Sequence, residues 1–394
     1  MEIKKGYKMT DVGVIPEDWE VKSIGDICVV KDGTHQTPNY TYFGIPFYSV
    51  ENISNNDFSN VKYISEEEHI ILSSNSKIEK GDVLMTRIGS IGCCKYIDWE
   101  VKASFYVSLA LLKFQDDECA RYFTHYSETN LFKDEIEQNS LQFAVPQKIN
   151  LGNIPKIRII LPSILKEQQA IADALTKVDN LIMSLSKVIE KKKLIKKGAM
   201  QKLLSGEMRL DGFEGEWIKI KLGDISSIKT GSRNVEEHSA NGKYPFFVRS
   251  KEVMKINTFS YDEEAILVPG EGGIGEIFHY VNGKFDVHQR VYKISDFNDK
   301  VNALFIYWYM IIFFGEYAKE NTVKATVDSL RLPTFTDFIC YLPATKAEQT
   351  AIADILTTMD NEIEALEKER DKYKCIKQGM MQQLLTGKIR LICQ

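Results

Sequence analysis

The feature that most constrains this 394-residue chain is an internal repeat, because a duplicated sequence implies a duplicated fold. The segment IPEDWEVKSIGDICVVKDGT, which begins at Ile15, returns as FEGEWIKIKLGDISSIKTGS from Phe213. Further along, LPSILKEQQAIADALTKVDN from Leu161 aligns without a gap to LPATKAEQTAIADILTTMDN from Leu342. Each half is a divergent block followed by a closely matched block. We therefore predict two similar domains, each followed by the same element.

The matched blocks have the pattern of long helices that pack against one another. Their apolar residues recur at alternating steps of four and three, as in the heptad seam of a coiled coil. Pro162 and Pro343 lie just upstream, and Gly206 and Gly387 are candidate helix stops. The simplest partner for each helix is the other one, in an antiparallel coiled coil with pseudo-two-fold symmetry. The predicted seam consists of Ile171, Leu175, Val178, Ile182, Leu185, Ile352, Leu356, Met359, Ile363 and Leu366.

The divergent blocks indicate α+β domains, because short β-rich runs alternate in them with Gly, Asn and Pro turns. Each block also holds one candidate amphipathic helix, from Glu118 and from Asn302. The offset between the copies shrinks between Pro46 and Ile91, which indicates that the second copy lacks a segment there. The predicted organisation is domain 1 over 1–160, a central conserved helix over 161–210, domain 2 over 211–341 and a C-terminal conserved helix over 342–394.

A helix of about forty residues is about 60 Å long, so the helices could measure the distance between the two domains. A homodimerising coiled coil without a measuring role is the alternative. The run KKKLIKK, at 191–197, is the densest cluster of cations. It could contact phosphates, or it could be the solvated face of a Lys-rich helix.

Three stretches of the divergent blocks offer side chains that suit base edges and phosphates. One follows the first strand, as KDGTHQTPNY (31–40) and KTGSRNVEEH (229–238). Another joins two strands, as TRIGSIGCC (86–94) and PGEGGIGEI (269–277), where glycines would let a ligand approach the backbone. The third, VHQRVYK (287–293), is polar only in the second copy. An ordinary hairpin or connector is the alternative for each. The candidate DNA contacts are Lys31, Thr34, His35, Gln36, Arg87, Ser90, Lys229, Ser232, Arg233, Asn234, His288, Gln289 and Arg290.

Composition and motifs argue against several other classes of protein. The net charge of -5 is unsuited to coating nucleic acid indiscriminately, although a single basic face could still bind it. Gly270, Gly272 and Gly275 satisfy GxGxxG, but a strand pattern follows them where a dinucleotide site needs a helix. The six histidines and seven cysteines have no metal-ligand spacing. We expect no catalytic residue, metal or cofactor in this chain, and a cytoplasmic location with reduced thiols.

In this order, the duplicated motifs resemble those of specificity subunits of type I restriction-modification systems. The resemblance covers nearly the whole chain. Its marks are Trp19 with Gly25-Asp26, Trp217 with Gly223-Asp224, DGTHQTP from Asp32, TRIGSIG from Thr86, LP...EQ..IA at 161–172 and 342–353, and QKLLSG against QQLLTG.

The resemblance implies a non-catalytic subunit that binds double-stranded DNA. Each target-recognition domain would read one half of a bipartite site, while the helices set the spacing and dock methyltransferase subunits. Translocase/nuclease (restriction) subunits would complete the complex, and S-adenosylmethionine, ATP and Mg2+ would belong to these partners. The second copy lacks the arginine of TRIGSIG, so a role for Arg87 does not transfer to it. A coiled-coil assembly scaffold whose domains bind a non-DNA ligand is the main alternative, and an autonomous nuclease is a third candidate.

Overall fold

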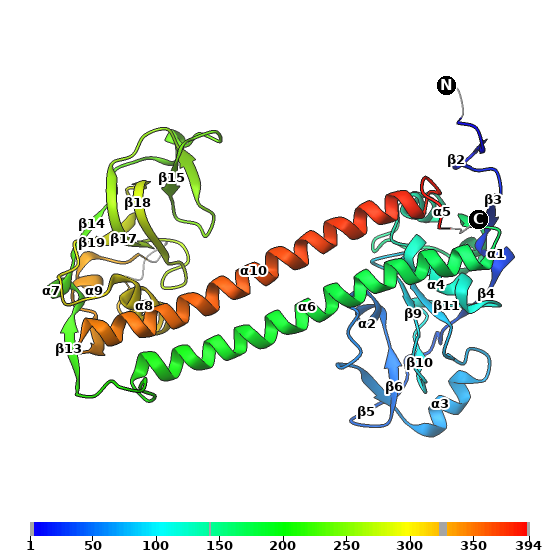
Figure 1. Ribbon diagram of the computed structural model, residues 1–394. Coiled ribbons are helices and arrows are strands. Elements are labelled where there is room, and N and C mark those ends of the chain that lie inside the picture. The colour runs from blue at the N-terminus through cyan, green and yellow to red at the C-terminus, as the bar shows by residue number, and fades with distance from the viewer. Residues whose placement is uncertain (1–3, 142, 323–328, 392–394) are drawn as a thin grey trace. The chain divides into compact units, whose positions relative to one another are not determined.

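The computed structural model describes residues 4–141, 143–322 and 329–391, and these form two compact units (Figure 1). Unit 1 contains residues 1–184 and 369–394, and unit 2 contains residues 185–368. The two long helices, α6 (Leu165–Ser205) and α10 (Lys346–Leu384), each contribute one end to each unit. Both units are therefore assembled from both halves of the sequence.

Domain 1 lies in unit 1 and combines several small sheets with helices. The hairpin of β1 (Tyr7–Thr10) and β2 (Gly13–Pro16) precedes β3 (Trp19–Ser23), which pairs with β12 (Arg158–Pro162). One sheet has the order β4 (Cys28–Asp32), β11 (Leu109–Phe114), β8 (Val83–Thr86), β9 (Cys94–Tyr96), and the other β10 (Ser104–Phe105), β6 (Ile45–Tyr48), β7 (Lys62–Ile64), β5 (Tyr40–Thr41). The helices are α1 (Ile24–Ile27), α2 (Val50–Ser54), α3 (Glu66–Ser73), α4 (Asp117–Tyr126), α5 (Asn130–Asn139) and the 3-10 helix Leu151–Lys156.

Domain 2 lies in unit 2 and repeats this plan. β13 (Trp217–Lys221) pairs with β20 (Ile339–Pro343). Its main sheet has the order β14 (Ser227–Thr230), β19 (Val291–Ser295), β17 (Tyr261–Pro269), β18 (His279–Val287), β15 (Tyr244–Phe247), β16 (Met254–Ile256). The helices are α7 (Leu222–Ile225), the 3-10 helix Val235–Glu237, α8 (Ala303–Glu320) and α9 (Leu332–Thr336).

The two domains share a topology beneath their different lengths. The antiparallel order β4-β11-β8 recurs as β14-β19-β17, and the parallel pair β6 and β10 recurs as β15 and β18. Domain 1 carries α2 and α3 between the matching strands, whereas the described chain of domain 2 has no helix there. The predicted α+β fold and the shorter second copy are thus confirmed. The prediction of one helix per domain was incomplete. Helices of four residues, such as α1 and α7, are too short to show a period of 3.6 residues, and α5, which is as long as α4, was missed.

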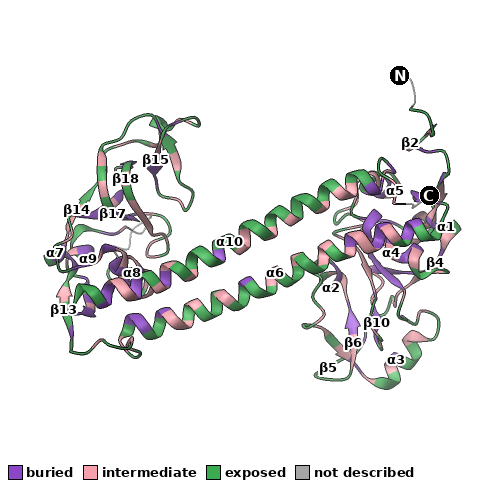
Figure 2. Ribbon diagram, in the orientation of Figure 1, coloured by how far each residue is buried: buried purple, intermediate pink, exposed green. Residues whose placement is uncertain are grey.

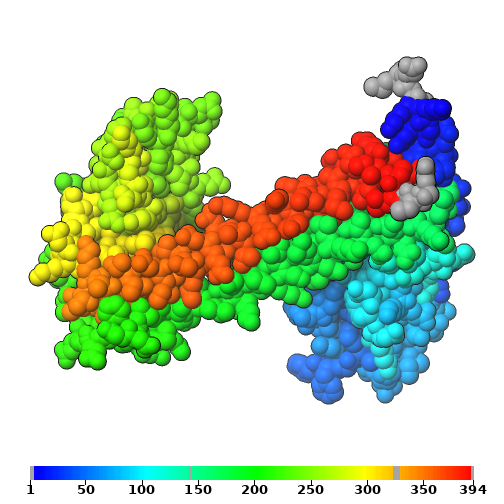
Figure 3. All heavy atoms as spheres, in the orientation of Figure 1, coloured from blue at the N-terminus to red at the C-terminus, as the bar shows by residue number. Residues whose placement is uncertain are grey.

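The ends of the long helices complete the domain cores. In unit 1, Ile171 and Leu175 of α6 are buried together with Leu384 and Leu385 at the C-terminal end of α10. Figure 2 shows buried residues, in purple, at both ends of α6 and α10, and Figure 3 shows the C-terminal end of α10, in red, lying against α6. In unit 2, Met200, Leu203 and Leu204 at the end of α6 are buried with Ile352 and Leu356 of α10. Within each unit the two helix segments run antiparallel, and all ten predicted seam residues are buried or half-buried.

Both helices stop near the predicted glycines. α6 ends at Ser205, directly before Gly206, whose φ is +77°, and α10 ends at Leu384, shortly before Gly387, whose φ is +69°. The backbone N–H of Met208 and that of Ile389 then donate to helix carbonyls, at 3.1 and 3.0 Å. None of the helices in the described part of the chain has the length and apolar character needed to cross a membrane.

An arginine just beyond each helix locks that helix end to the domain of the other repeat. Arg390 binds Glu167 through Nε and Nη2 at 2.6 and 2.8 Å, and binds Asp18 at 2.8 and 2.6 Å. Glu167 is 2% exposed and also accepts a hydrogen bond from Trp19 Nε1 at 3.1 Å. We call this arrangement the arginine clasp. Its arginine–glutamate pair recurs in unit 2, where Arg209 binds the buried Glu348 at 2.6 and 2.8 Å and donates to the Gly215 carbonyl at 2.8 Å.

Replacing Arg390 with alanine is expected to lower the free energy of unfolding by about 3 kcal/mol, because Glu167 would remain a buried carboxylate without its cation. Urea unfolding of the full chain, followed by tryptophan fluorescence, measures this change. The matched control is Lys22→Ala, which removes a 3.0 Å ion pair to Glu20 between exposed side chains. The control is expected to cost less than about 1 kcal/mol. Equal losses in the two variants would contradict the clasp.

Candidate nucleic-acid interface

In each domain, three segments that are far apart in the sequence meet at one place. We call them loop A (31–40 and 229–238), loop B (86–94 and 269–277) and segment C (105–109 and 287–291). In domain 1, the Thr34 amide donates to the Phe105 carbonyl at 3.2 Å, the Val107 amide donates to the Thr34 carbonyl at 2.9 Å, and the Arg87 amide donates to the Ser108 carbonyl at 2.9 Å. Backbone hydrogen bonds therefore join loops A and B to segment C.

The same bonds are present in domain 2. The Arg233 amide donates to the Val287 carbonyl at 3.2 Å, and the Gln289 amide donates back to the Arg233 carbonyl at 2.9 Å. The Gly270 amide donates to the Arg290 carbonyl at 2.8 Å. Because these contacts use the backbone, they can form beneath different exposed side chains.

A glycine permits the approach of loop A to segment C in both domains. A Cβ on Gly33 would lie 2.6 Å from the Tyr106 carbonyl carbon, and one on Gly231 would lie 2.1 Å from the Val287 oxygen. Backbone atoms cannot move aside as a flexible side chain can. The repeated glycine is therefore required by this packing.

The polar side chains of loops A and B in domain 1 differ in exposure. His35, Gln36 and Ser90 are exposed, while Thr34 is half-buried. His35 Nε2 lies 2.9 Å from Asp32 Oδ2. Lys31 is half-buried and donates to the Asn75 carbonyl at 2.9 Å. Several predicted contacts thus share one surface.

Arg87 occupies a different environment from these residues. It is 5% exposed, its Nε donates to the Val107 carbonyl at 2.5 Å, and its Nη2 lies 3.3 Å from Asp32 Oδ1. The guanidinium thus links loop B to segment C and loop A. In this arrangement the guanidinium group binds within its own domain.

Domain 2 exposes another set of polar groups. Lys229, Ser232, Asn234, Gln289 and Arg290 are exposed, and Gln289 Nε2 donates to Asn234 Oδ1 at 2.8 Å. Segment C is polar in domain 2 and apolar in domain 1, so the two domains expose different side chains at this place.

Arg233 and His288 shape this surface from beneath. Arg233 Nε donates to the fully buried Asp286 at 3.0 Å, and its Nη1 donates to Glu237 at 3.0 Å. His288 is 5% exposed, and its Nδ1 accepts the Arg290 amide at 3.0 Å. Burial lowers the pKa of His288, and the cations Arg249 and Arg290 lower it further. The imidazole is therefore neutral near pH 7 and can accept this bond.

Sequence reasoning missed two features of these surfaces. Arg249, which is exposed, lies beside Arg290 because both donate to Glu271, at 3.3 and 3.0 Å. In domain 1, the stretch 143–149 packs beside loop B, where the Gly89 amide donates to the Gln147 carbonyl at 2.8 Å. This stretch carries Phe143, 96% exposed, and Val145, 99% exposed. The signal that the sequence offered was the presence of apolar residues in a turn-rich stretch.

The glycines of loop B in domain 2 have a packing role. A Cβ on Gly275 would lie 2.6 Å from the Gly315 Cα, so loop B approaches α8 closely at this point. We predicted that these glycines let a ligand approach the backbone, but the close packing against α8 already accounts for Gly275. The GxGxxG loop leads from β17 into the strand β18. It therefore lacks the following helix that a dinucleotide site needs.

The basic run at 191–197 is largely paired within unit 2. Lys192 lies 2.6 Å from Glu362, Lys193 lies 2.8 Å from Glu367, and Lys196 forms an ion pair with Asp360. These cations hold α6 against α10, which lowers the charge that remains for phosphates. The six cysteines in the described chain form no disulfide.

Comparisons with known proteins agree with this architecture. The family described as "Type I restriction modification DNA specificity domain" matches residues 16–196 and 214–372. A Methanocaldococcus jannaschii protein that carries the name type I restriction enzyme MjaX specificity subunit is 29% identical over 98% of this chain and 97% of its own length. The MjaVIII specificity subunit of the same organism is 26% identical over 96% of this chain and 94% of its own length.

A solved structure is similar in fold. The S subunit of a type I restriction-modification system from M. genitalium covers 98% of both chains with a TM-score of 0.71 and 16% identity. The family match extends over most of both repeats. The chain therefore belongs to the type I restriction-modification DNA specificity family, as the non-catalytic subunit that determines which DNA target the complex recognises.

Proposed function

We propose that each domain reads one half of a bipartite site on double-stranded DNA, with loops A and B and segment C facing the bases. The observation that carries this proposal is the duplicated set of backbone hydrogen bonds, which holds three loops together beneath different exposed side chains. Amide and guanidinium groups such as those of Gln36, Gln289 and Arg290 suit adenine and guanine edges in the major groove. A fixed scaffold with variable side chains is what two readers of different sequences require.

The residues proposed to touch DNA divide into two groups by exposure. Those on the surface are proposed as direct contacts: His35, Gln36, Ser90, Lys229, Ser232, Asn234, Gln289 and Arg290. Arg87, Arg233 and His288 are proposed to position the loops, because their polar atoms bind within their own domain. Lys31 and Thr34 are half-buried and are retained as contacts from the edge of loop A.

We also propose that Arg249, Phe143 and Val145 join these surfaces. Arg249 shares Glu271 with Arg290, so DNA phosphates could compete with Glu271 for two cations at once. Phe143 and Val145 could contact a thymine methyl group or a base step.

The partners are proposed from the family. The chain would bind methyltransferase subunits, which use S-adenosylmethionine, and translocase/nuclease subunits, which use ATP and Mg2+. The domain boundaries proposed for this purpose are 1–160 and 211–341, with the conserved helices at 161–210 and 342–394. Residues 323–328, which belong to the proposed second domain, lie outside the described residues.

The assembly scaffold with a non-DNA ligand predicts a different result in a domain exchange. Residues 1–160 would be replaced by the matching domain of a relative, and the methylated sites would be mapped in a host that carries the complex. Our proposal requires that one half of the recognised sequence changes and that the other half stays the same. Unchanged methylation sites would favour the scaffold.

Replacing Gln289 and Arg290 with alanine is expected to weaken discrimination at the second half-site by about 5- to 150-fold, because one good bidentate base contact is worth about 1 to 3 kcal/mol. Selection from randomised duplexes by the chain with its methyltransferase partners measures the preference at each base pair. The first half-site should keep its sequence. A matched control is Lys219→Ala, which removes an exposed cation from β13 and should alter neither half. An unchanged second half-site would refute the assignment.

Gly231→Ala is expected to weaken reading of the second half-site, and Gly33→Ala that of the first, because each Cβ would push loop A away from segment C. Binding of duplexes with one altered half-site separates the two effects. Gly198→Ala serves as the control, since a Cβ there meets nothing within 4 Å and lies on α6. It should leave DNA binding intact and raise stability by about 1 kcal/mol. Equal losses at both half-sites in either loop variant would contradict the model of independent domains.

Inserting seven residues after Leu185 of α6 and after Leu366 of α10 is expected to lengthen the spacer between half-sites by about three base pairs. Seven residues preserve the heptad phase and add about 10 Å of helix, against a rise of about 3.4 Å per base pair. Methylated-site mapping reads the spacer directly. The same insertion in α6 alone would break the match with α10 and should abolish assembly. An unchanged spacer with the double insertion would remove the measuring role.

A further inference from the structure

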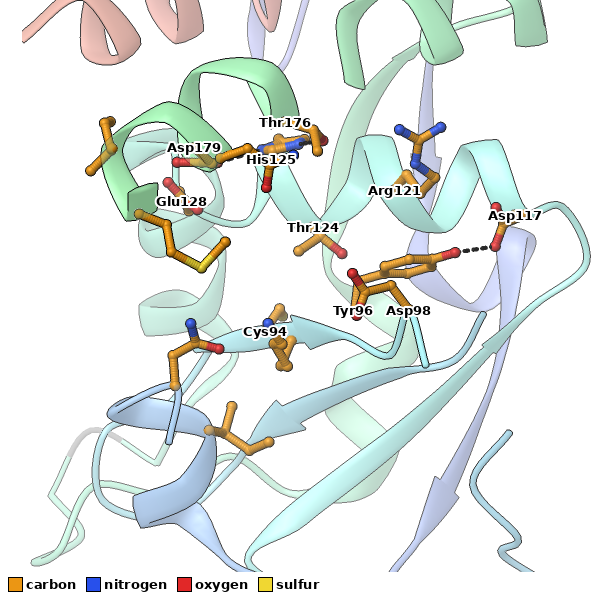
Figure 4. A pocket seen from close by; sticks show the side chains of 16 residues that line it. Cys94, Tyr96, Asp98, Asp117, Arg121, Thr124, His125, Glu128, Thr176 and Asp179 are labelled. Atoms are coloured by element: carbon orange, nitrogen blue, oxygen red, sulfur yellow. Dashed lines mark hydrogen bonds and ion pairs between the residues drawn. The ribbon is translucent and has the colours of Figure 1, made fainter. Parts of the chain in front are cut away.

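A polar cluster in unit 1 lies where α4 meets α6, in a pocket that is also lined by Cys94 at the end of loop B (Figure 4). His125 lies near the end of α4, Glu128 follows that helix, and Asp179 projects from α6. One ligand atom of each of these three side chains lies within 4.8 Å of the others. The sequence could not reveal this set, because Asp179 belongs to a different helix.

The His125 ring has one bonded and one unbonded nitrogen. Its side chain is 9% exposed, and its Nε2 lies 2.9 Å from Thr176 Oγ1. Nδ1 is buried without a hydrogen-bond partner in the described structure, and it lies 3.7 Å from Asp179 Oδ2. With the ring proton on Nε2, the lone pair of Nδ1 points toward the carboxylates. A metal-ligating histidine is held in this way, through its other nitrogen.

A cation already occupies the space between the two carboxylates. The ammonium group of Lys377, from α10, lies 2.7 Å from Glu128 and 2.8 Å from Asp179. The cluster therefore attracts positive charge. The Lys377 side chain is long and flexible, so it could leave these oxygens for another cation.

The other repeat shows which part of this arrangement helix packing requires. There, Lys196 pairs with Asp360, and Thr357 accepts a hydrogen bond from Trp308 Nε1 at 3.2 Å. Lys196 lies 4.3 Å from the centroid of a Trp308 ring. The Thr, Asp and Lys of the helices thus recur, but the ring is a tryptophan.

The residue three positions after that tryptophan is Ile311, where domain 1 has Glu128. Packing of the helices is therefore achieved in unit 2 without a histidine and without a second carboxylate. The imidazole of His125 and the carboxylate of Glu128, which domain 1 supplies, are therefore not explained by packing.

The cluster opens onto a pocket of about 730 Å³ in unit 1, which gives an ion an entry path and room for water. Figure 4 shows that His125, Glu128 and Asp179 lie together at one end of this pocket, away from Tyr96 and Asp117. Tyr96 donates a 2.5 Å hydrogen bond to Asp117, so these groups are already satisfied.

We propose that His125 Nδ1 and the carboxylates of Glu128 and Asp179 bind one divalent transition-metal ion, with water from the pocket as a further ligand. An imidazole and two carboxylates suit Zn2+ and Co2+. Ligand atoms of a tetrahedral site lie about 3.3 Å apart. The three ligand atoms lie within 4.8 Å of one another, so they must close by up to about 1.5 Å. Glu128 is exposed and follows the helix, which permits this movement.

Metal binding would change which helix is tied to α4. In the present arrangement Lys377 joins α10 to Glu128. The ion would replace that ion pair with a direct link from α4 to Asp179 of α6. When the ion is bound, Glu128 would therefore be linked to α6 instead of α10.

The test is a Co2+ titration of the full chain, followed by visible absorption. One equivalent should give the d–d bands of a nitrogen- and oxygen-ligated ion. His125→Trp, which copies Trp308 of the other repeat, should abolish the bands. Glu128→Gln, which changes an exposed residue, should weaken binding at least tenfold and guards against misfolding of the His125 variant.

Lys377→Met should tighten Co2+ binding at least tenfold, because it removes the competing ammonium group. The matched control is Lys196→Met, which makes the same change in the other repeat and should leave Co2+ binding unchanged. Bands that persist unchanged in both His125→Trp and Glu128→Gln would overturn the site. Binding by Lys377→Met alone would also overturn it, since Lys377 would then be the permanent occupant. None of these results depends on DNA binding.

Discussion

The structure depends on one packing interaction, in which the C-terminal end of each long helix is buried in the domain core of the other repeat. Leu384 and Leu385 fill the core of domain 1, and Leu203 and Leu204 fill that of domain 2. Apolar contacts stabilise this packing. The arginines fix the position of each helix end, because the buried carboxylates of Glu167 and Glu348 need a cation. Neither domain could complete its core from its own half alone. The duplicated helix ends are therefore as necessary as the domains themselves.

This dependence explains where the repeats were free to diverge. A change at Leu384 or Arg390 would disturb a core and a buried carboxylate together. A change at Gln36 or Gln289 alters only an exposed side chain, because backbone hydrogen bonds hold loop A and segment C. Only the glycine of loop A is bound to that packing. The matched blocks therefore contain the helix ends that complete the cores, and the divergent blocks contain the exposed residues of the loops.

The sequence predicted the architecture because a repeat and a heptad period are one-dimensional signals. The helices, the α+β domains and the shortened second copy could all be recognised from spacing. Side-chain environment could not. Arg87 and Arg233 carry the charge of DNA contacts, yet their guanidinium groups bind Asp32 and Asp286. Arg249 was missed because only the fold brings it to Glu271 beside Arg290. Whether an arginine is free to contact DNA depends on carboxylates that are distant in the sequence.

The two junctions between domain helix and long helix show how a duplicated scaffold can acquire an asymmetric function. Both use a threonine, an aspartate and a lysine from the matched blocks. Trp308 completes one junction. Its ring N–H donates to Thr357, and the ring lies beside the ammonium group of Lys196, which also pairs with Asp360. His125 completes the other but leaves Nδ1 buried without a hydrogen bond, a cost that packing alone does not recover. The ion that we propose to bind between this nitrogen and the two carboxylates would offset that cost.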